Sequence, residues 1–209
     1  MKIIHYPFSL KDKETLITAI QQNQVIVFPT ETFYALGGNA LSEQVAARVY
    51  QIKQRSDRKP LLTLISAKWL PVLSGPLTEP TSQLMEHFWP GPLTLILPSA
   101  PQAPFFLKEK TSQGIALRYS PSPVVQEMIQ LSERPLIGTS ANLSGQPECM
   151  TVDGVLAQLG NLPDLIVDGG TTPGGKASTL VNCLSFPFSI EREGVLPVAL
   201  LQPYLFTDV

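Results

Sequence analysis

Basic side chains are concentrated in one short stretch of this chain. Residues 53–59 read KQRSDRK and contain Lys53, Arg55, Arg58 and Lys59, whereas the whole chain of 209 residues has 15 basic residues and a formal net charge of −2. Arginine offers a planar fork of donors and lysine a point charge, so the cluster suits a multiply charged anion such as a triphosphate. A solvated charged turn is the alternative interpretation of such a cluster.

A polar segment directly follows the apolar run at residues 25–28. Residues 29–38 read PTETFYALGG, in which proline ends a strand and Glu31 stands between two threonines. Polar groups just beyond the carboxyl end of a strand lie where open α/β sheets usually bind ligands. Gly37 and Gly38 would let the backbone turn tightly or approach a ligand. The threonines could instead simply cap the following turn.

Two further segments offer groups for an anionic ligand. Residues 114–119, GIALRY, alternate so that Ala116 and Arg118 share one face of a strand. An arginine on the inner face of a buried strand needs a carboxylate or an anionic ligand. Residues 139–145, TSANLSG, supply short donors and acceptors that could hold phosphate or ribose oxygens. Taken alone, this second segment could be an ordinary polar turn.

Two familiar motifs are present only in part. Residues 170–176, GTTPGGK, match the core of a Walker A loop, but Ala177 replaces the hydroxyl residue and the following STLVNC is typical of a strand instead of a helix. Residues 138–142 begin like a nucleophile elbow, but Asn142 stands where its last glycine is required. We therefore expect neither a P-loop nor a serine hydrolase.

Composition narrows the class of protein. Hydrophobic residues make up 44% of the chain and charged residues 15%, against roughly 25% charged residues in typical globular domains. A pI near 5.7 argues against a surface coated in positive charge.

No apolar run approaches the roughly 20 residues that span a membrane, and the N-terminus lacks signal-peptide features. Two cysteines that form neither a CxxC motif nor a disulfide framework predict a cytoplasmic protein, and two histidines without nearby cysteine ligands argue against a structural zinc site.

Helical and strand patterns alternate along the chain. Apolar periodicity predicts helices over 10–21 and 45–52, the second capped by Ser42, and Ser120 and Pro121 fit the start of a helix through Ile129. Thr151 fits the cap of a further helix. Runs that favour strands are 25–28, 61–65, 93–97, 114–119, 135–138, 164–167, 178–183 and 188–191. This alternation predicts one α/β domain over residues 1–209, with a twisted, mixed sheet flanked by helices.

The order of the short motifs is more specific than any one of them. PTETFYALG, KQR, WPGPLT, ALR, TSANLSG, ASTLV and EREG follow one another between Val25 and Gly194. This pattern resembles the YrdC domain family, the L-threonylcarbamoyladenylate synthases, and is most similar to the short single-domain bacterial type because the chain ends soon after EREG. Two features depart from the family pattern: Ser56, where many relatives have proline, and the 170–176 loop.

The resemblance implies a fold and a reaction. The fold would be a twisted sheet with a large open cavity. The reaction would be nucleotidyl transfer, in which L-threonine, bicarbonate or CO₂, and ATP with Mg²⁺ give threonylcarbamoyl-AMP and pyrophosphate. The product would pass to a tRNA threonylcarbamoyl transferase complex that makes N6-threonylcarbamoyladenosine at position 37 of tRNA.

The resemblance also implies roles for individual residues. The KxR…SxN signature of the family falls on Lys53, Arg55, Ser140 and Asn142. The first two would act in catalysis, and all four would bind ATP together with Lys59, Thr151 and Arg192. The amino acid would lie near Thr32, Leu64, Arg118 and Ser178, with its carboxylate on the arginine.

Three other interpretations are compatible with the same sequence. A paralogue could share the fold without the reaction. An RNA-binding module could use the basic cavity without catalysis and bind RNA weakly, although the net charge speaks against it. A carbamoyltransferase of the kind found in hydrogenase maturation or antibiotic biosynthesis would need domains that 209 residues do not hold.

Arg55→Ala should remove most of the activity and leave the protein folded, because the role we infer for Arg55 is stabilisation of charge and not packing. Turnover and the circular dichroism spectrum of the variant check this expectation. Near wild-type turnover would contradict it.

Overall fold

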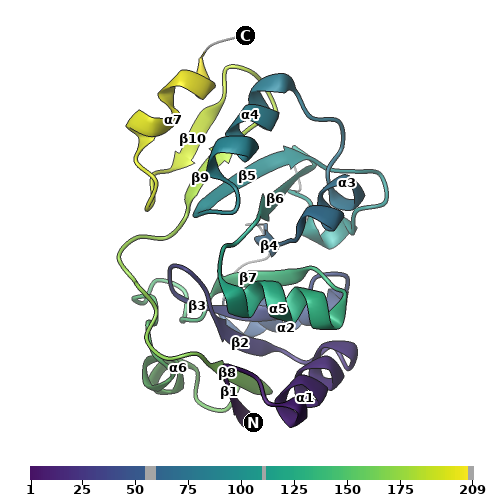
Figure 1. Ribbon diagram of the computed structural model, residues 1–209, viewed down its shortest axis with the longest axis vertical. Helices are drawn as coiled ribbons and strands as arrows, with labels where there is room; N and C mark the ends of the chain where they lie inside the picture. Colours follow the sequence, from purple (N-terminus) through teal and green to yellow (C-terminus); the bar gives the residue numbers. More distant parts are fainter. Residues whose placement is uncertain (55–59, 110–111, 207–209) are drawn as a thin grey trace.

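A mixed β-sheet runs along the long axis of the molecule (Figure 1). The computed structural model describes residues 1–54, 60–109 and 112–206. Within these residues ten strands are ordered β1-β8-β2-β3-β7-β4-β6-β5-β9-β10. The strands are β1 (Lys2–His5), β2 (Ile26–Pro29), β3 (Tyr34–Asn39), β4 (Thr63–Leu64), β5 (Leu93–Pro98), β6 (Gly114–Arg118), β7 (Leu136–Ser140), β8 (Leu165–Asp168), β9 (Thr179–Asn182) and β10 (Ser189–Arg192).

Parallel and antiparallel neighbours are interspersed in the sheet. The pairs β1–β8, β2–β8, β4–β6 and β5–β9 are parallel. The pairs β2–β3, β3–β7, β4–β7, β5–β6 and β9–β10 are antiparallel. The predicted α/β class with a mixed sheet is confirmed.

Helices cover both faces of the half of the sheet that carries the N-terminus. The helices are α1 (Leu10–Gln21), α2 (Glu43–Ile52), α3 (Leu70–Leu73), α4 (Glu79–Phe88), α5 (Pro123–Ser132), α6 (Val152–Leu159) and α7 (Val198–Leu205). Side chains alternate along β2, so that Ile26 and Phe28 share a core with α1 and α5, whereas Val27 shares a core with α2 and α6. The predicted helix 10–21 is confirmed, and its Ser9 and Asp12 form a capping box.

In the other half of the sheet, one face packs on the hydrophobic core and the opposite face lines a cavity. Leu95 on β5, Leu117 on β6 and Val181 on β9 belong to the same core as Leu84 of α4 and Leu201 of α7. The alternate residues of these three strands point to the opposite face. They lie outside both hydrophobic cores and line a cavity.

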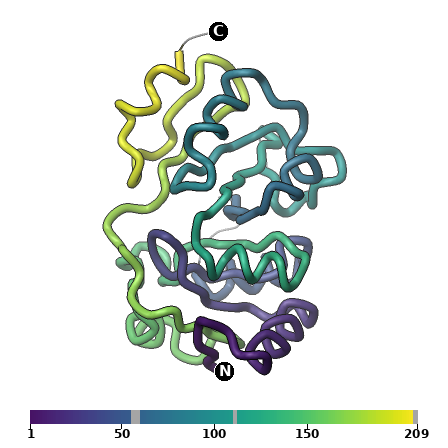
Figure 2. The backbone as a smooth tube through the Cα atoms, viewed as in Figure 1, coloured from purple at the N-terminus to yellow at the C-terminus, as the bar shows by residue number. Residues whose placement is uncertain are grey.

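A coil joins the two halves along one side of the molecule. It leaves β8 at Asp168 and enters β9 at Thr179, and Figure 2 shows it as the yellow-green tube that runs from the lower to the upper part. The coil includes the 170–176 segment. Its Gly174 donates to the carbonyl of Thr32, at 2.8 Å between N and O. The coil is therefore fastened to the turn between β2 and β3.

The structure corrects several predictions of local structure. Tyr34–Asn39 forms strand β3, so Gly37 and Gly38 lie in a strand and not in a loop. Ser122, two residues later than expected, caps α5 by accepting from the Val125 N–H group. The edge strand β1 and the helix α7 were not predicted. No helix among the described residues is long and apolar enough to cross a bilayer.

Gly37 allows β3 and β7 to approach closely, and its replacement should destabilise the protein. A Cβ atom at this position would lie 1.7 Å from the Ile137 carbonyl oxygen, a backbone atom that cannot turn aside. Gly37→Ala should lower the free energy of unfolding by about 3 kcal/mol or more. Urea denaturation measures this change.

Gly154 in α6 provides the matched control. An added Cβ atom there meets its neighbours at 3.5 Å or more, and alanine favours the helix by about 1 kcal/mol. Gly154→Ala should therefore be neutral or stabilising. Equal effects of the two substitutions would contradict the importance of the close approach at Gly37.

Candidate functional site

The candidate site is a cavity of about 970 Å³. Its floor comes from the alternate residues of β5, β6 and β9, among which Ala116 pairs with Ile96 and Ile96 pairs with Asn182. The remaining walls come from the β2–β3 turn, the end of α2, the loop after β7 and the start of β9. Segments far apart in the sequence therefore meet around one space.

Lys53 fastens the loop after β7 to the end of α2. The residue is the C-cap of α2, and only 4% of its surface is exposed. Its ammonium group donates to the carbonyl oxygens of Ser140, at 2.5 Å, and Asn142, at 2.9 Å, and to the Asn142 side-chain oxygen, at 2.9 Å. Because an ammonium group has three donors, these acceptors can engage all of them. Lys53 thus shapes the loop that carries the SxN residues.

The side chains of that loop hold one another in place. The Ser140 hydroxyl donates to Asn142 Oδ1 at 2.7 Å. The Asn142 amide nitrogen donates to the carbonyl of Gln146. The N–H group of Ser144 donates to the carbonyl of Lys53 at 3.2 Å. The signature residues Lys53, Ser140 and Asn142 therefore form a single hydrogen-bonded unit.

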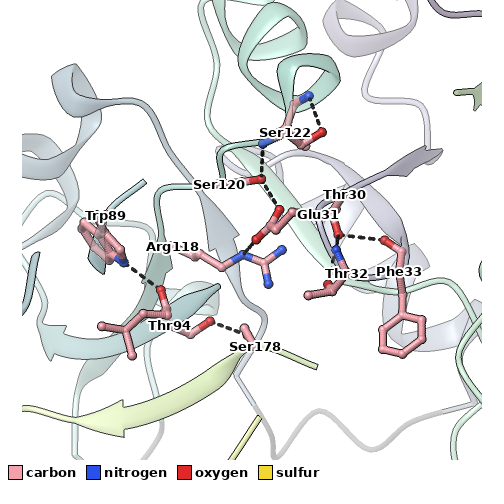
Figure 3. Close-up of polar contacts among 12 residues, drawn as sticks. Thr30, Glu31, Thr32, Phe33, Trp89, Thr94, Arg118, Ser120, Ser122 and Ser178 are labelled. Carbon is pink, nitrogen blue, oxygen red and sulfur yellow. Dashed lines mark hydrogen bonds and ion pairs between the residues drawn. The ribbon is translucent and has the colours of Figure 1, made fainter. Parts of the chain in front are cut away.

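Arg118 is a second buried cation of the cavity (Figure 3). Its side chain is 4% exposed, and its Nε atom lies 3.3 Å from the Glu31 carboxylate. Burial lowers the pKa of Arg118, the Glu31 charge opposes that effect, and the nearby Arg192 charge adds to it. Arg118 and Arg192 both line the cavity.

Arg192 and Thr94 converge on Ser178. The Arg192 guanidinium donates to the Ser178 carbonyl from Nε at 3.2 Å and from Nη2 at 2.9 Å. The hydroxyls of Ser178 and Thr94 lie 2.8 Å apart (Figure 3). Burial lowers the pKa of Arg192, and Glu148 opposes that effect. Arg192 is thus held in the cavity by a backbone oxygen, and no carboxylate among the described residues forms an ion pair with it.

The turn between β2 and β3 is ordered by its own threonines. The Thr30 hydroxyl donates to the Phe33 carbonyl at 2.8 Å and lies 3.1 Å from the Thr32 hydroxyl. Both threonines line the cavity. The PTET segment therefore presents hydroxyl groups to a ligand from a rigid turn.

The predicted site residues divide into those that meet in the cavity and those that do not. The cavity wall contains Thr32, Lys53, Arg118, Ser140, Asn142, Ser178 and Arg192. Arg55 and Lys59 lie outside the described residues. The Leu64 side chain is fully buried in the core, where Gly138 faces it, and Leu62 lines the cavity instead. Thr151 caps α6 by accepting from the Gly154 N–H group and is not part of the cavity wall.

Some groups of the site were not predicted from the sequence. Thr94 is surrounded by leucines in its strand, and only the alternation of residues 93–97 could have placed it on the cavity face. The contact of Glu31 with Arg118 joins positions too far apart for any spacing rule. The described residues contain no cluster of three or more His, Cys, Asp or Glu side chains that could hold a metal ion.

Comparisons with known proteins establish the family. The profile of the Sua5/YciO/YrdC family, whose description reads "Telomere recombination", matches residues 18–194. The threonylcarbamoyl-AMP synthase of Yersinia enterocolitica is 36% identical over 165 residues, which cover 76% of this chain and 86% of that protein. The chain belongs to the Sua5/YciO/YrdC family.

Longer relatives match over part of their length. The threonylcarbamoyl-AMP synthase of Pyrococcus abyssi is 35% identical over 180 residues, which cover 86% of this chain and 53% of that protein. That of Bacillus subtilis is 38% identical over 168 residues, which cover 78% of this chain and 48% of that protein. The chain thus spans about half the length of these two relatives.

Solved structures agree on the fold. The crystal structure of P. abyssi Sua5 complexed with L-threonine superimposes with a TM-score of 0.91 at 31% identity, covering 98% of this chain and 61% of that chain. Escherichia coli YciO superimposes with a TM-score of 0.85 at 24% identity, covering 95% of this chain and 97% of that chain. The second likeness shows the fold alone.

Lys53→Met should destabilise the protein, because it leaves two buried carbonyl oxygens and the Asn142 side chain without their charged donor. We expect the free energy of unfolding to fall by about 2–4 kcal/mol, measured by urea denaturation. Lys11→Met, at an exposed position on α1, should change it by less than about 0.5 kcal/mol. A Lys53 variant as stable as the Lys11 variant would refute the role of Lys53 in fastening the loop after β7 to α2.

Proposed function

We propose that this chain is an L-threonylcarbamoyladenylate synthase, a nucleotidyltransferase that serves the threonylcarbamoylation of tRNA. The observation that carries the proposal is the meeting of two anion-binding groups in one cavity. Lys53 with Ser140 and Asn142 forms one, and Arg118 with Ser178 and Arg192 forms the other. Membership of a family in which the named relatives are threonylcarbamoyl-AMP synthases supports it.

In this proposal the amino acid binds at Arg118. Neither terminal nitrogen of this guanidinium has a hydrogen-bond partner among the described residues, as Figure 3 illustrates. A carboxylate fits such a fork of two donors. The hydroxyls of Thr32 and Ser178 lie in the same part of the cavity and suit the amine and hydroxyl of threonine.

ATP occupies the remaining part of the cavity in this proposal. The loop shaped by Lys53 offers hydroxyl and amide groups for ribose and phosphate oxygens, and Arg192 offers charge from the opposite wall. Arg55 and Lys59 would add charge from outside the described residues. Mg²⁺ would enter bound to the phosphates, and the carboxylates of Glu109, Glu148 and Glu191 are the described groups on the wall suited to it.

The reaction follows from the arrangement of charge. The neutral amine of threonine attacks CO₂, or an electrophile derived from bicarbonate, and forms a carbamate. A carbamate oxygen then attacks the α-phosphorus of ATP, and the bond to the β-phosphate oxygen breaks, releasing pyrophosphate. Both reactants are anionic, so the protein acts by holding them together and offsetting their charge.

The proposal also includes where the protein works and what receives its product. We place it in the cytoplasm, where ATP and tRNA are available. Threonylcarbamoyl-AMP is labile, so direct transfer to a tRNA threonylcarbamoyl transferase complex is part of the proposal.

Pyrophosphate release from ATP should require both L-threonine and bicarbonate. A coupled pyrophosphate assay on the full chain, with each substrate omitted in turn, measures this requirement. Release without threonine, or no release from folded protein, would refute the proposed function. Salt-sensitive RNA binding by such inactive protein would favour the RNA-binding module instead.

A further inference from the structure

The side chain of Glu31 is the counter-charge of Arg118. The two groups meet at 3.3 Å between Arg118 Nε and Glu31 Oε1, and their side chains are 4% and 14% exposed. Neither atom makes a well-aligned hydrogen bond. The contact is therefore an attraction between charges, strengthened by the low polarity of its surroundings.

Glu31 approaches the guanidinium from one edge only. In Figure 3 the two terminal nitrogens of Arg118 point away from Glu31, toward Thr32 and Ser178. The ion pair thus occupies the inner edge and leaves the outer fork for a ligand. An arginine without this partner would be drawn to other oxygens of the cavity wall, because a buried guanidinium needs acceptors.

Glu31 is itself held by two residues that join neighbouring elements. The Ser120 hydroxyl donates to Glu31 Oε2. Ser120 accepts from the Ser122 N–H group at 3.2 Å, and the Ser122 hydroxyl donates to the Pro29 carbonyl at 3.3 Å. The carboxylate is therefore anchored to the start of α5 and to the end of β2, which are rigid elements on either side.

The negative charge of Glu31 also affects which anion Arg118 attracts. The Arg118–Glu31 ion pair has a net charge near zero. A ligand is therefore held mainly by hydrogen bonds from the two terminal nitrogens of Arg118. A monovalent carboxylate is well served by such a fork. A triphosphate gains more from uncompensated charge, such as that of Arg192 on the cavity wall, which forms no ion pair among the described residues.

We propose that Glu31 is a positioning residue that directs the outer fork of Arg118 into the cavity and reserves it for the carboxylate of the amino acid by making it a poor site for the phosphates of ATP. This inference rests on the proposed function. It assigns Glu31 no contact with the substrate.

Two substitutions separate the two effects of Glu31. Glu31→Gln keeps the length of the side chain and removes its charge, whereas Glu31→Asp keeps the charge and shortens the reach. Isothermal titration of L-threonine into the full chain, with and without an ATP analogue that cannot be cleaved at the α-phosphorus, measures both effects.

Glu31→Gln should weaken L-threonine binding about tenfold, and the ATP analogue should weaken it further by competing for Arg118. Glu31→Asp should weaken binding to a similar extent without that competition. Ser120→Ala, which loosens the anchor of Glu31, should give a smaller loss and also no competition. Glu127→Gln, an equivalent change in a surface ion pair with Lys13, should bind L-threonine as the wild type does.

The outcomes distinguish this inference from the proposed function. If the wild-type chain neither binds L-threonine nor releases pyrophosphate, the proposed function fails and the inference falls with it. If the wild type does both and folded Glu31→Gln binds L-threonine equally well with and without the analogue, the inference alone is overturned. If Glu31→Gln does not fold, a Ser120→Ala variant with unchanged threonine affinity overturns it.

Discussion

Two cations of the cavity, Lys53 and Arg118, are buried, and among the described residues only Arg118 is paired with a carboxylate. Arg118 has Glu31 as its partner, but Lys53 and Arg192 are held mainly by backbone carbonyl oxygens. A carbonyl satisfies a donor without cancelling its charge, so the desolvation cost of the cation is reduced while its field remains. The cavity therefore keeps an attraction for anions that a set of complete ion pairs would have removed.

This arrangement depends on where the strands end. The carbonyl that binds Lys53 belongs to Ser140, the last residue of β7, and the one that binds Arg192 belongs to Ser178, directly before β9. Lys53 reaches its acceptors because it caps the C-terminus of α2, where the helix dipole also favours a cation. The register of the sheet, including the close approach at Gly37, thus determines the position of each charge.

The sequence allowed the elements and most of the cavity residues to be predicted, because those rest on local patterns. The alternation at 114–119 correctly placed Ala116 and Arg118 on the cavity face, and Thr151 caps α6 as expected. Leu64 was assigned to the amino-acid site by resemblance alone, and in the structure its side chain is buried in the core while Leu62 lines the cavity. Ser120 looked like a helix cap by its neighbours, whereas its hydroxyl binds Glu31, a partner that only the tertiary fold brings near.

The burial of the cations affects which kind of anion can bind in the cavity. Lys53 and Arg118 are each 4% exposed, so the phosphates of a folded RNA on the surface could not contact them. Among the charged residues that are exposed on the described cavity wall, Glu148 and Glu191 outnumber Arg192, so their charge would repel a large polyanion. A small anion that passes these carboxylates gains the field of the buried cations in surroundings of low polarity, where that field is strongest. The distribution of charge with depth therefore favours small anionic substrates over a nucleic-acid surface.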